Sequence, residues 1–182
     1  MAAKLEPILT IADLDAMPDD GNRYELIEGE LFGSCAPSLG HQRILINLAF
    51  LFKRYLLANP IGEAFPGPAV ILSNFSGVIP DFIYLSNGSL KRIATGDRIT
   101  GAPDLVIEIL LPATENQRRD RHSKRQLYGR HCVKEYWIID PERLVIEIYS
   151  TARFKLVKTL GIDDEVTSPL LPGFHCSVKE IF

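Results

Sequence analysis

The sequence predicts a mixed α/β or α+β fold, and three observations carry this prediction. Apolar residues recur at helical spacing between Ser38 and Asn59, which indicates one long amphipathic helix. Residues 102–111 form a nearly unbroken run of apolar β-formers, which is typical of a strand buried on both faces. Residues 135–140 and 144–149 are rich in aromatic and β-branched side chains and predict the two arms of a β-hairpin.

Length, composition and charge restrict the class of protein. The chain has 182 residues, 46% hydrophobic and 24% charged, so we expect a single domain over residues 1–182, with residues 1–21 as a lead-in that contains a short helix. It has no run of about 18 apolar residues and no signal-peptide pattern, so we expect a cytoplasmic protein without a membrane partner. The three cysteines lack paired spacing, which supports neither a disulfide framework nor a zinc site. The net charge of −3 argues against a protein that coats nucleic acid by charge alone.

The shorter elements are predicted by their end signals. Ser, Thr and Asp before apolar runs indicate helix starts, and proline or Gly-Asn clusters indicate where elements end. In the first half of the chain we expect a short helix capped by Thr10 and Asp13, a hairpin over residues 23–34 around Gly29, and the long helix capped by Ser38. A proline-interrupted edge strand over residues 63–72, a strand over residues 78–85 and a loop with at most one helical turn over residues 86–101 should follow. In the second half we expect a helix from Thr114 to about Arg130, short strands over residues 154–159 and around Val166, and a turn or short helix near Lys179.

Two carboxylates interrupt the apolar run at residues 102–111. Side chains alternate along a strand, so Asp104, Glu108 and Leu110 share one face, and the intervening apolar residues fill the other. A carboxylate in the middle of a buried strand costs several kcal/mol of desolvation free energy unless it is paired. Glu108 therefore needs a partner, and a cation is a common partner of such groups at functional sites.

The strand over residues 78–85 offers a second carboxylate, Asp81. Antiparallel pairing with Leu85 opposite Asp104 would place Asp81 directly opposite Glu108, with Cβ atoms about 5 Å apart. Asp104 is about 13 Å from Glu108 along the strand and cannot share a cation with it. Carboxylate oxygens select hard cations, so we expect Asp81 and Glu108 to hold Mg²⁺ or Mn²⁺, which can activate water and neutralise charge on a phosphodiester.

A nearby ammonium would complete such a site by orienting the water or stabilising the transition state. The natural position is two residues beyond Glu108 on the same face, but that position holds Leu110. The following helix offers Lys124 instead.

The order of the sequence motifs resembles a known family. The motifs are Tyr24-Glu25-Leu26-Ile27-Glu28-Gly29-Glu30-Leu31, His41, Pro80-Asp81, the run from Ala102 to Ile109, Asp120-Arg121 with Lys124 and Tyr128, and the run from Val133 to Pro141. Together they resemble the Uma two family of endonucleases within the PD-(D/E)XK, or restriction-endonuclease-like, superfamily. The resemblance covers about residues 22–150 and rests on the combination of motifs, since each one alone is a weak signal.

This resemblance implies a restriction-endonuclease-like fold, with a mixed central β-sheet flanked by helices, and metal-dependent cleavage of DNA. It maps Asp81 and Glu108 to the two acidic residues and Lys124 to the helical lysine of the family. The chain departs from the superfamily at Leu110, where the superfamily lysine would fall. It also has Leu111-Pro112-Ala113 where the family usually has Ser-Pro-Ser.

Further candidates each keep a structural alternative. Glu25 in the first hairpin, His41 in the first turn of the long helix and Asp104 at the strand entrance are accessory candidates, but each could instead be structural or lie at the surface. The polar helix carries a basic run that could contact a phosphate backbone or form only a solvated face; its candidate nucleic-acid contacts are Arg118, Arg119, Arg121 and Arg125.

We therefore expect a Mg²⁺-dependent endonuclease that acts on DNA through Asp81, Glu108 and Lys124. The alternative is a degenerate module that binds nucleic acid or a protein without cutting. For the single residues, the structural alternatives are that Glu108 pairs with a neighbouring arginine and that Lys124 is solvated. A small-molecule hydrolase lacks support, since there is no Gly-x-Ser-x-Gly elbow or glycine-rich phosphate loop. Oligomeric state stays open, although nucleases that cut both strands commonly act as homodimers and residues 135–149 offer apolar and aromatic surface.

Overall fold

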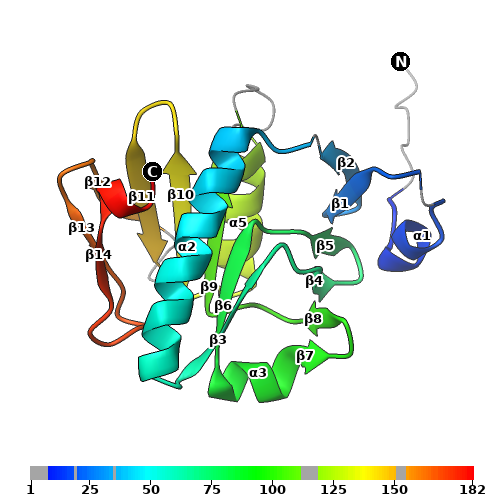
Figure 1. Ribbon diagram of the computed structural model, residues 1–182. Helices are drawn as coiled ribbons and strands as arrows, with labels where there is room; N and C mark the ends of the chain where they lie inside the picture. The colour runs from blue at the N-terminus through cyan, green and yellow to red at the C-terminus, as the bar shows by residue number, and fades with distance from the viewer. Residues whose placement is uncertain (1–7, 19, 35, 112–118, 151–154) are drawn as a thin grey trace.

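Two mixed six-stranded β-sheets organise the chain (Figure 1). The structure is a computed structural model, and it describes residues 8–18, 20–34, 36–111, 119–150 and 155–182. The helices are α1 (Ile11–Asp15), α2 (Leu39–Ala58), α3 (Asn87–Ile93), a π-helical turn (Arg119–Lys124) that continues into α5 (Arg125–Arg130), and a 3₁₀ turn (Val178–Glu180). The strands are β1 (Arg23–Ile27), β2 (Glu30–Ser34), β3 (Gly62–Pro66), β4 (Val70–Ser73), β5 (Ser76–Val78), β6 (Phe82–Ser86), β7 (Ala94–Thr95), β8 (Arg98–Thr100), β9 (Leu105–Ile109), β10 (Glu135–Asp140), β11 (Val145–Ser150), β12 (Lys155–Leu160), β13 (Glu165–Thr167) and β14 (His175–Ser177).

The first sheet has the strand order β2-β1-β5-β4-β8-β7. Its predicted hairpin, β1 and β2, turns through Glu28 and Gly29, both of which have positive φ (52° and 85°). Consecutive left-handed residues match the twist of a two-residue hairpin, which explains the glycine at this position. The predicted short helix α1 is present, with the capping box of Thr10 and Asp13, and the backbone N–H of Ile11 donates to Asn74 beside this sheet.

The second sheet has the strand order β12-β11-β10-β9-β6-β3, with β9 and β10 parallel. β6 and β9 pair antiparallel, with Phe82 opposite Ile107 and Tyr84 opposite Leu105. This is the predicted register, and one further residue along it brings Asp81 opposite Glu108. β3 lies at the sheet edge, as its prolines predict.

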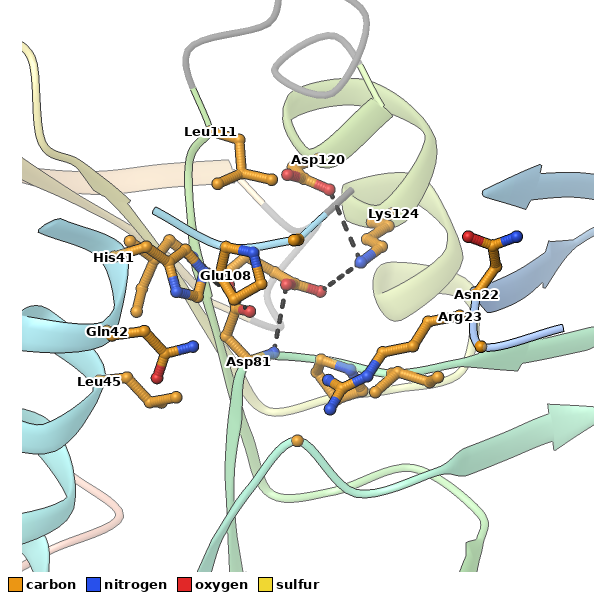
Figure 2. A pocket seen from close by; sticks show the side chains of 17 residues that line it. Asn22, Arg23, His41, Gln42, Leu45, Asp81, Glu108, Leu111, Asp120 and Lys124 are labelled. Carbon is orange, nitrogen blue, oxygen red and sulfur yellow. Dashed lines mark hydrogen bonds and ion pairs between the residues drawn. The ribbon is translucent and has the colours of Figure 1, made fainter. Parts of the chain in front are cut away.

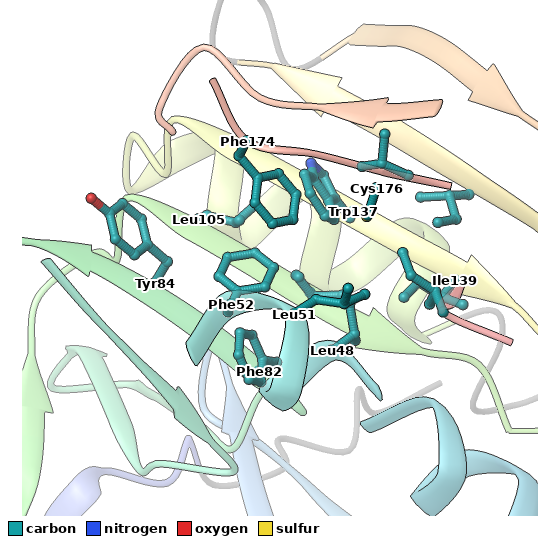
Figure 3. Packing of buried hydrophobic residues seen from close by; sticks show 14 of the residues in the cluster. Leu48, Leu51, Phe52, Phe82, Tyr84, Leu105, Trp137, Ile139, Phe174 and Cys176 are labelled. Atoms are coloured by element: carbon teal, nitrogen blue, oxygen red, sulfur yellow. The ribbon is translucent and has the colours of Figure 1, made fainter. Parts of the chain in front are cut away.

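Helices cover both faces of the second sheet. α2, capped by Ser38 as predicted, contributes Leu48 and Phe52 to a buried cluster with Ile107 and Trp137 (Figure 3). On the opposite face, Tyr128 of α5 belongs to a second buried cluster that also contains Val106 of β9 and Leu110, which follows the strand. The alternation predicted for β9 and the mixed central sheet flanked by helices are both confirmed. Of the helices described, none is long and apolar enough to cross a membrane.

Several predicted boundaries are wrong. The expected strand over residues 78–85 is divided: β5 belongs to the first sheet and β6 to the second, and residues 79–81 connect them. Pro80 lacks the N–H that a continuous ladder needs, which favours a break there. Residues 63–72 are likewise divided between β3 and β4 in different sheets. The expected loop over residues 86–101 instead contains α3 and the hairpin of β7 and β8.

Two further expectations concern the second half of the chain. The helix start at Thr114 lies outside the described residues. The predicted hairpin over residues 135–149 is confirmed as β10 and β11, but most of its apolar residues are buried within the protein, and Leu144 in the connecting turn is exposed. β10 is buried along its whole length and β11 over its four central residues, because the hairpin lies between the two buried clusters on either face of the sheet.

Candidate active site

A cleft of about 340 Å³ lies where the β5–β6 connection, the end of β9 and the first turns of α2 meet (Figure 2). Its titratable lining residues come from five segments of the chain that are far apart in sequence, namely Arg23, His41, Asp81, Glu108, Asp120 and Lys124. Asp81, Glu108 and Asp120 line the cleft directly, so the cleft floor is acidic.

Asp81 and Glu108 are neighbours at this cleft floor. The backbone N–H of Asp81 donates to Oε2 of Glu108 at 3.3 Å, and the N–H of Ile109 donates to Oδ2 of Asp81 at 2.7 Å. Asp81 keeps 24% of its side-chain surface exposed, whereas Glu108 is almost fully buried. The two predicted metal ligands are therefore brought together, with Asp81 as the more accessible of the pair.

Lys124 reaches Glu108 from the π-helical turn. Its Nζ lies 2.8 Å from Oε1 of Glu108 and 2.9 Å from Oε1 of Glu25, and 3.6 Å from Oδ1 of Asp120. Its side chain is buried, so the alternative of a solvated lysine is wrong, as is the alternative of an arginine partner for Glu108. Leu110 lies in the buried cluster beneath, so the ammonium that is missing from β9 is supplied by a helix.

The electrostatic balance of the site is unfavourable to an ionised Glu108. Burial raises the pKa of Glu108 to about 8; the Lys124 ammonium opposes this shift, while Asp81, Asp120 and Glu25 reinforce it. The Tyr128 hydroxyl donates to Oε1 of Glu108 at 2.9 Å, and burial holds the pKa of Tyr128 well above its ordinary value. Tyr128 therefore remains a protonated donor while the carboxylates repel one another.

His41 lies at the site and not at the surface. Its Nε2 is 3.0 Å from Oδ1 of Asp81, and its side chain is 5% exposed. Its Nδ1 is buried and has no hydrogen-bond partner among the described residues. A proton on Nδ1 would be a buried unpaired donor, so we place the proton on Nε2, which donates to Asp81.

Glu25 stands behind the lysine. It is buried on β1, and its Oε1 accepts the backbone N–H of Ile79 at 2.8 Å as well as contacting Lys124. It does not line the cleft. Glu25 thus connects the first sheet, the β5–β6 connection and the π-helical turn.

Three other candidates, Asp104, Arg121 and Arg125, do not line the cleft. Asp104 accepts the N–H of Ser86 at 2.7 Å and pairs with Lys134 at 2.6 Å. Arg121 pairs with Asp140 at 2.8 Å, and the guanidinium of Arg125 stacks 5.2 Å from the ring centre of Tyr149. Arg118 lies outside the described residues, and the side chain of Arg119 is not described either. The described part of the basic run therefore faces the β10–β11 hairpin.

Sequence reasoning missed three residues of the site. Asp120 and Tyr128 were matched to the family pattern, but no role was predicted for them. Their spacing of four residues on either side of Lys124 is a usable signal, since such residues share a helix face. Arg23 gave no signal, because nothing in the sequence distinguishes it from other strand-edge arginines.

The donor set suits a hard divalent cation. Among the described residues, no group of three or more His, Cys, Asp and Glu side chains forms a metal cage. Mg²⁺ does not require one, because it is commonly held by one or two carboxylates together with waters and substrate phosphate. Asp81 and Glu108 supply these carboxylates at the cleft, where burial is the main cause of the raised pKa of Glu108 and the neighbouring acidic groups add to it.

The central mixed sheet flanked by helices places this chain in the restriction-endonuclease-like class of folds. The family model described as "Uma2: Putative restriction endonuclease" matches residues 11–179, and the chain belongs to this family. A crystal structure titled as a putative nuclease belonging to DUF820 from Anabaena variabilis ATCC 29413 superposes with a TM-score of 0.78, covers 96% of this chain and 97% of its own, and is 21% identical. No curated protein matches the chain.

Proposed function

We propose that this protein is a metal-dependent endonuclease that hydrolyses phosphodiester bonds of DNA. The family supports a nuclease. The observation that carries the proposal for this chain is the contact of Lys124 Nζ with Glu108 Oε1 at 2.8 Å, beside Asp81. The cleft thus contains a lysine and two carboxylates, although the position of the superfamily lysine, residue 110, is a leucine.

Asp81 and Glu108 would hold Mg²⁺ or Mn²⁺. The bound cation would lower the pKa of water and neutralise charge on the phosphodiester. The Ile109 N–H and His41 Nε2 fix the two oxygens of Asp81 before substrate arrives. Lys124 presents an ammonium beside Glu108, where it can orient the attacking water or stabilise the negative charge that develops on the phosphate.

The test is cleavage of supercoiled plasmid with purified protein in Mg²⁺ or Mn²⁺. We expect nicked or linear product, no product in EDTA, and a loss of roughly 100-fold or more in Asp81→Ala and Glu108→Ala. Asp97→Ala is the matched control, because Asp97 is an exposed acid in the β7–β8 turn and does not line the cleft. Cleavage that survives Glu108→Ala at the control rate would contradict the proposal.

A binding module that does not cut is the second candidate. It is favoured by the hydrogen bonds that the protein already donates to both oxygens of Glu108, from Lys124 and Tyr128 to Oε1 and from Asp81 to Oε2. In that case the variants Asp81→Ala and Glu108→Ala bind DNA as the wild type does, and no metal condition yields product.

A further inference from the structure

Arg23 lies at the mouth of the acidic cleft, at the first position of β1. We propose that its guanidinium binds a backbone phosphate of the DNA substrate and so admits the anionic chain to the cleft. This inference rests on the proposed nuclease function and identifies a substrate contact outside the Asp81, Glu108 and Lys124 set.

The cleft itself is unfavourable for a phosphodiester. Asp81, Glu108 and Asp120 line it, and Glu25 lies directly behind Lys124. Like charges at such short range repel in proportion to the inverse of their separation, and a partly buried site screens them weakly. The divalent cation proposed for Asp81 and Glu108 would meet the scissile phosphate, and Lys124 is already surrounded by three carboxylates, so a neighbouring backbone phosphate needs another cation.

Of the basic residues expected to fill this role, the two whose side chains the structure describes are committed elsewhere. Arg121 is tied to Asp140 and to Glu147, and Arg125 stacks over Tyr149. Both contacts belong to the β10–β11 hairpin and not to the cleft lining. Moving either side chain to the cleft would break an ion pair or a cation–π contact.

Arg23 supplies the required cation without leaving its position in the fold. Its side chain is exposed and lines the cleft, and within the described part of the chain no carboxylate lies at ion-pair distance from it. Figure 2 shows Arg23 and Gln42 on opposite sides of Asp81, so the guanidinium and an amide flank the accessible metal ligand. These two side chains come from different walls, β1 and α2.

The chemistry of arginine suits this position. A guanidinium donates two parallel hydrogen bonds to a phosphate, and it remains charged at every physiological pH. Contacts of this kind fix the position of the backbone and carry no base information. We therefore expect Arg23 to contribute to affinity for every DNA sequence, and to account for about one unit in the slope of log affinity against log salt.

The experiment measures binding of a fluorescein-labelled 20-base-pair duplex by anisotropy, with Ca²⁺ in place of Mg²⁺ and at several salt concentrations. Arg23→Ala should weaken binding roughly tenfold and lower the salt slope by about one. Arg23→Lys should keep the slope and recover only part of the affinity, because an ammonium lacks the paired donors. Arg54→Ala is the matched control: Arg54 is exposed on α2, lies outside the cleft, and its loss changes net charge equally.

The outcomes separate the two proposals. If the wild type cuts plasmid but Arg23→Ala binds and cuts like Arg54→Ala, the assignment of Arg23 is overturned and the nuclease proposal stands. If the wild type neither binds duplex nor cuts plasmid, both fail. Thermal unfolding followed by circular dichroism shows whether Arg23→Ala is folded, and a weakened but folded variant supports the assignment.

Discussion

At each end of strand β9 an acidic side chain pairs with a lysine, but the pKa of the acid is shifted in opposite directions. At the entrance, Asp104 pairs with Lys134, and near the far end Glu108 pairs with Lys124. Burial opposes ionisation of Asp104, but Lys134 and the Ser86 N–H outweigh it, and the net pKa of Asp104 is lowered. Burial raises the pKa of Glu108 to about 8 despite its lysine.

The surroundings of each pair explain the difference. The Lys134 side chain is 54% exposed and serves one carboxylate, whereas the Lys124 side chain is 3% exposed and is shared among Glu25, Glu108 and Asp120. A lysine beside a buried acid is therefore not sufficient to stabilise its charge. The entrance pair is an ordinary structural contact, and the far end is a strained cluster of the kind found at functional sites.

The largest expected effect compares the two lysines. Lys124→Met should lower the free energy of unfolding by about 3–5 kcal/mol, because it leaves three buried carboxylates without their cation. Lys134→Met should cost less, about 1 kcal/mol, since the Lys134 side chain is 54% exposed to solvent and the buried Asp104 keeps the Ser86 N–H as a donor. Urea denaturation at pH 7 measures both.

A double variant sharpens this result. Adding Asp120→Asn to Lys124→Met removes one of the crowded acidic groups and should recover part of the loss. Equal destabilisation by the two lysine substitutions would show that the ends of β9 are equivalent, and the comparison would fail.

The next effect concerns the orientation of Asp81, which lies beside Glu108 at the far end of β9. His41→Leu removes the Nε2–H donor and should weaken Mn²⁺ binding about 10–100-fold, as is typical when a ligand loses the group that orients it. His41→Gln keeps an N–H donor at a similar reach and should bind Mn²⁺ nearly as the wild type does. Isothermal titration calorimetry measures both affinities, and unchanged binding in His41→Leu would remove His41 from the site.

The smallest effect tests the entrance pair by its pH dependence. Asp104→Asn should cost about 1.5 kcal/mol at pH 7, because the hydrogen bonds to a charged acceptor are lost. Since folding lowers the pKa of Asp104 below 3.8, its contribution is fully present above that pH and is lost as the pH falls through the folded value. The gap between wild type and Asp104→Asn should therefore narrow below about pH 4 in urea titrations. A gap that stays constant from pH 7 to pH 3.5 would contradict this account.

Local patterns in the sequence predicted the central part of the fold. The alternation of side chains along β9 placed Ile107 and Glu108 on opposite faces of the sheet. The pairing of sequential strands gave the register that brings Asp81 to Glu108. Ser38 and Asn59 marked both ends of α2 because capping is a local interaction. The strand over residues 78–85 was wrongly predicted as continuous, because its apolar pattern continues on both sides of Pro80.

The remaining features depend on contacts that distant segments make. Arg121 looked available for nucleic acid until β10 and β11 supplied Asp140 and Glu147 as its partners. The apolar hairpin looked like a free surface because the segments that cover it, in α2, α5 and the C-terminal region, are remote in sequence. Arg23 became a candidate only when the fold placed it across the cleft from α2.

The site also has a consequence for how the protein matures. Its titratable groups come from β1, the β5–β6 connection, β9 and the π-helical turn, so they span the chain from Glu25 to Lys124. Contacts between such remote positions form late in folding. A nascent chain on the ribosome lacks the lysine until residue 124 has emerged and docked. The proposed site is therefore assembled only in the later stages of folding.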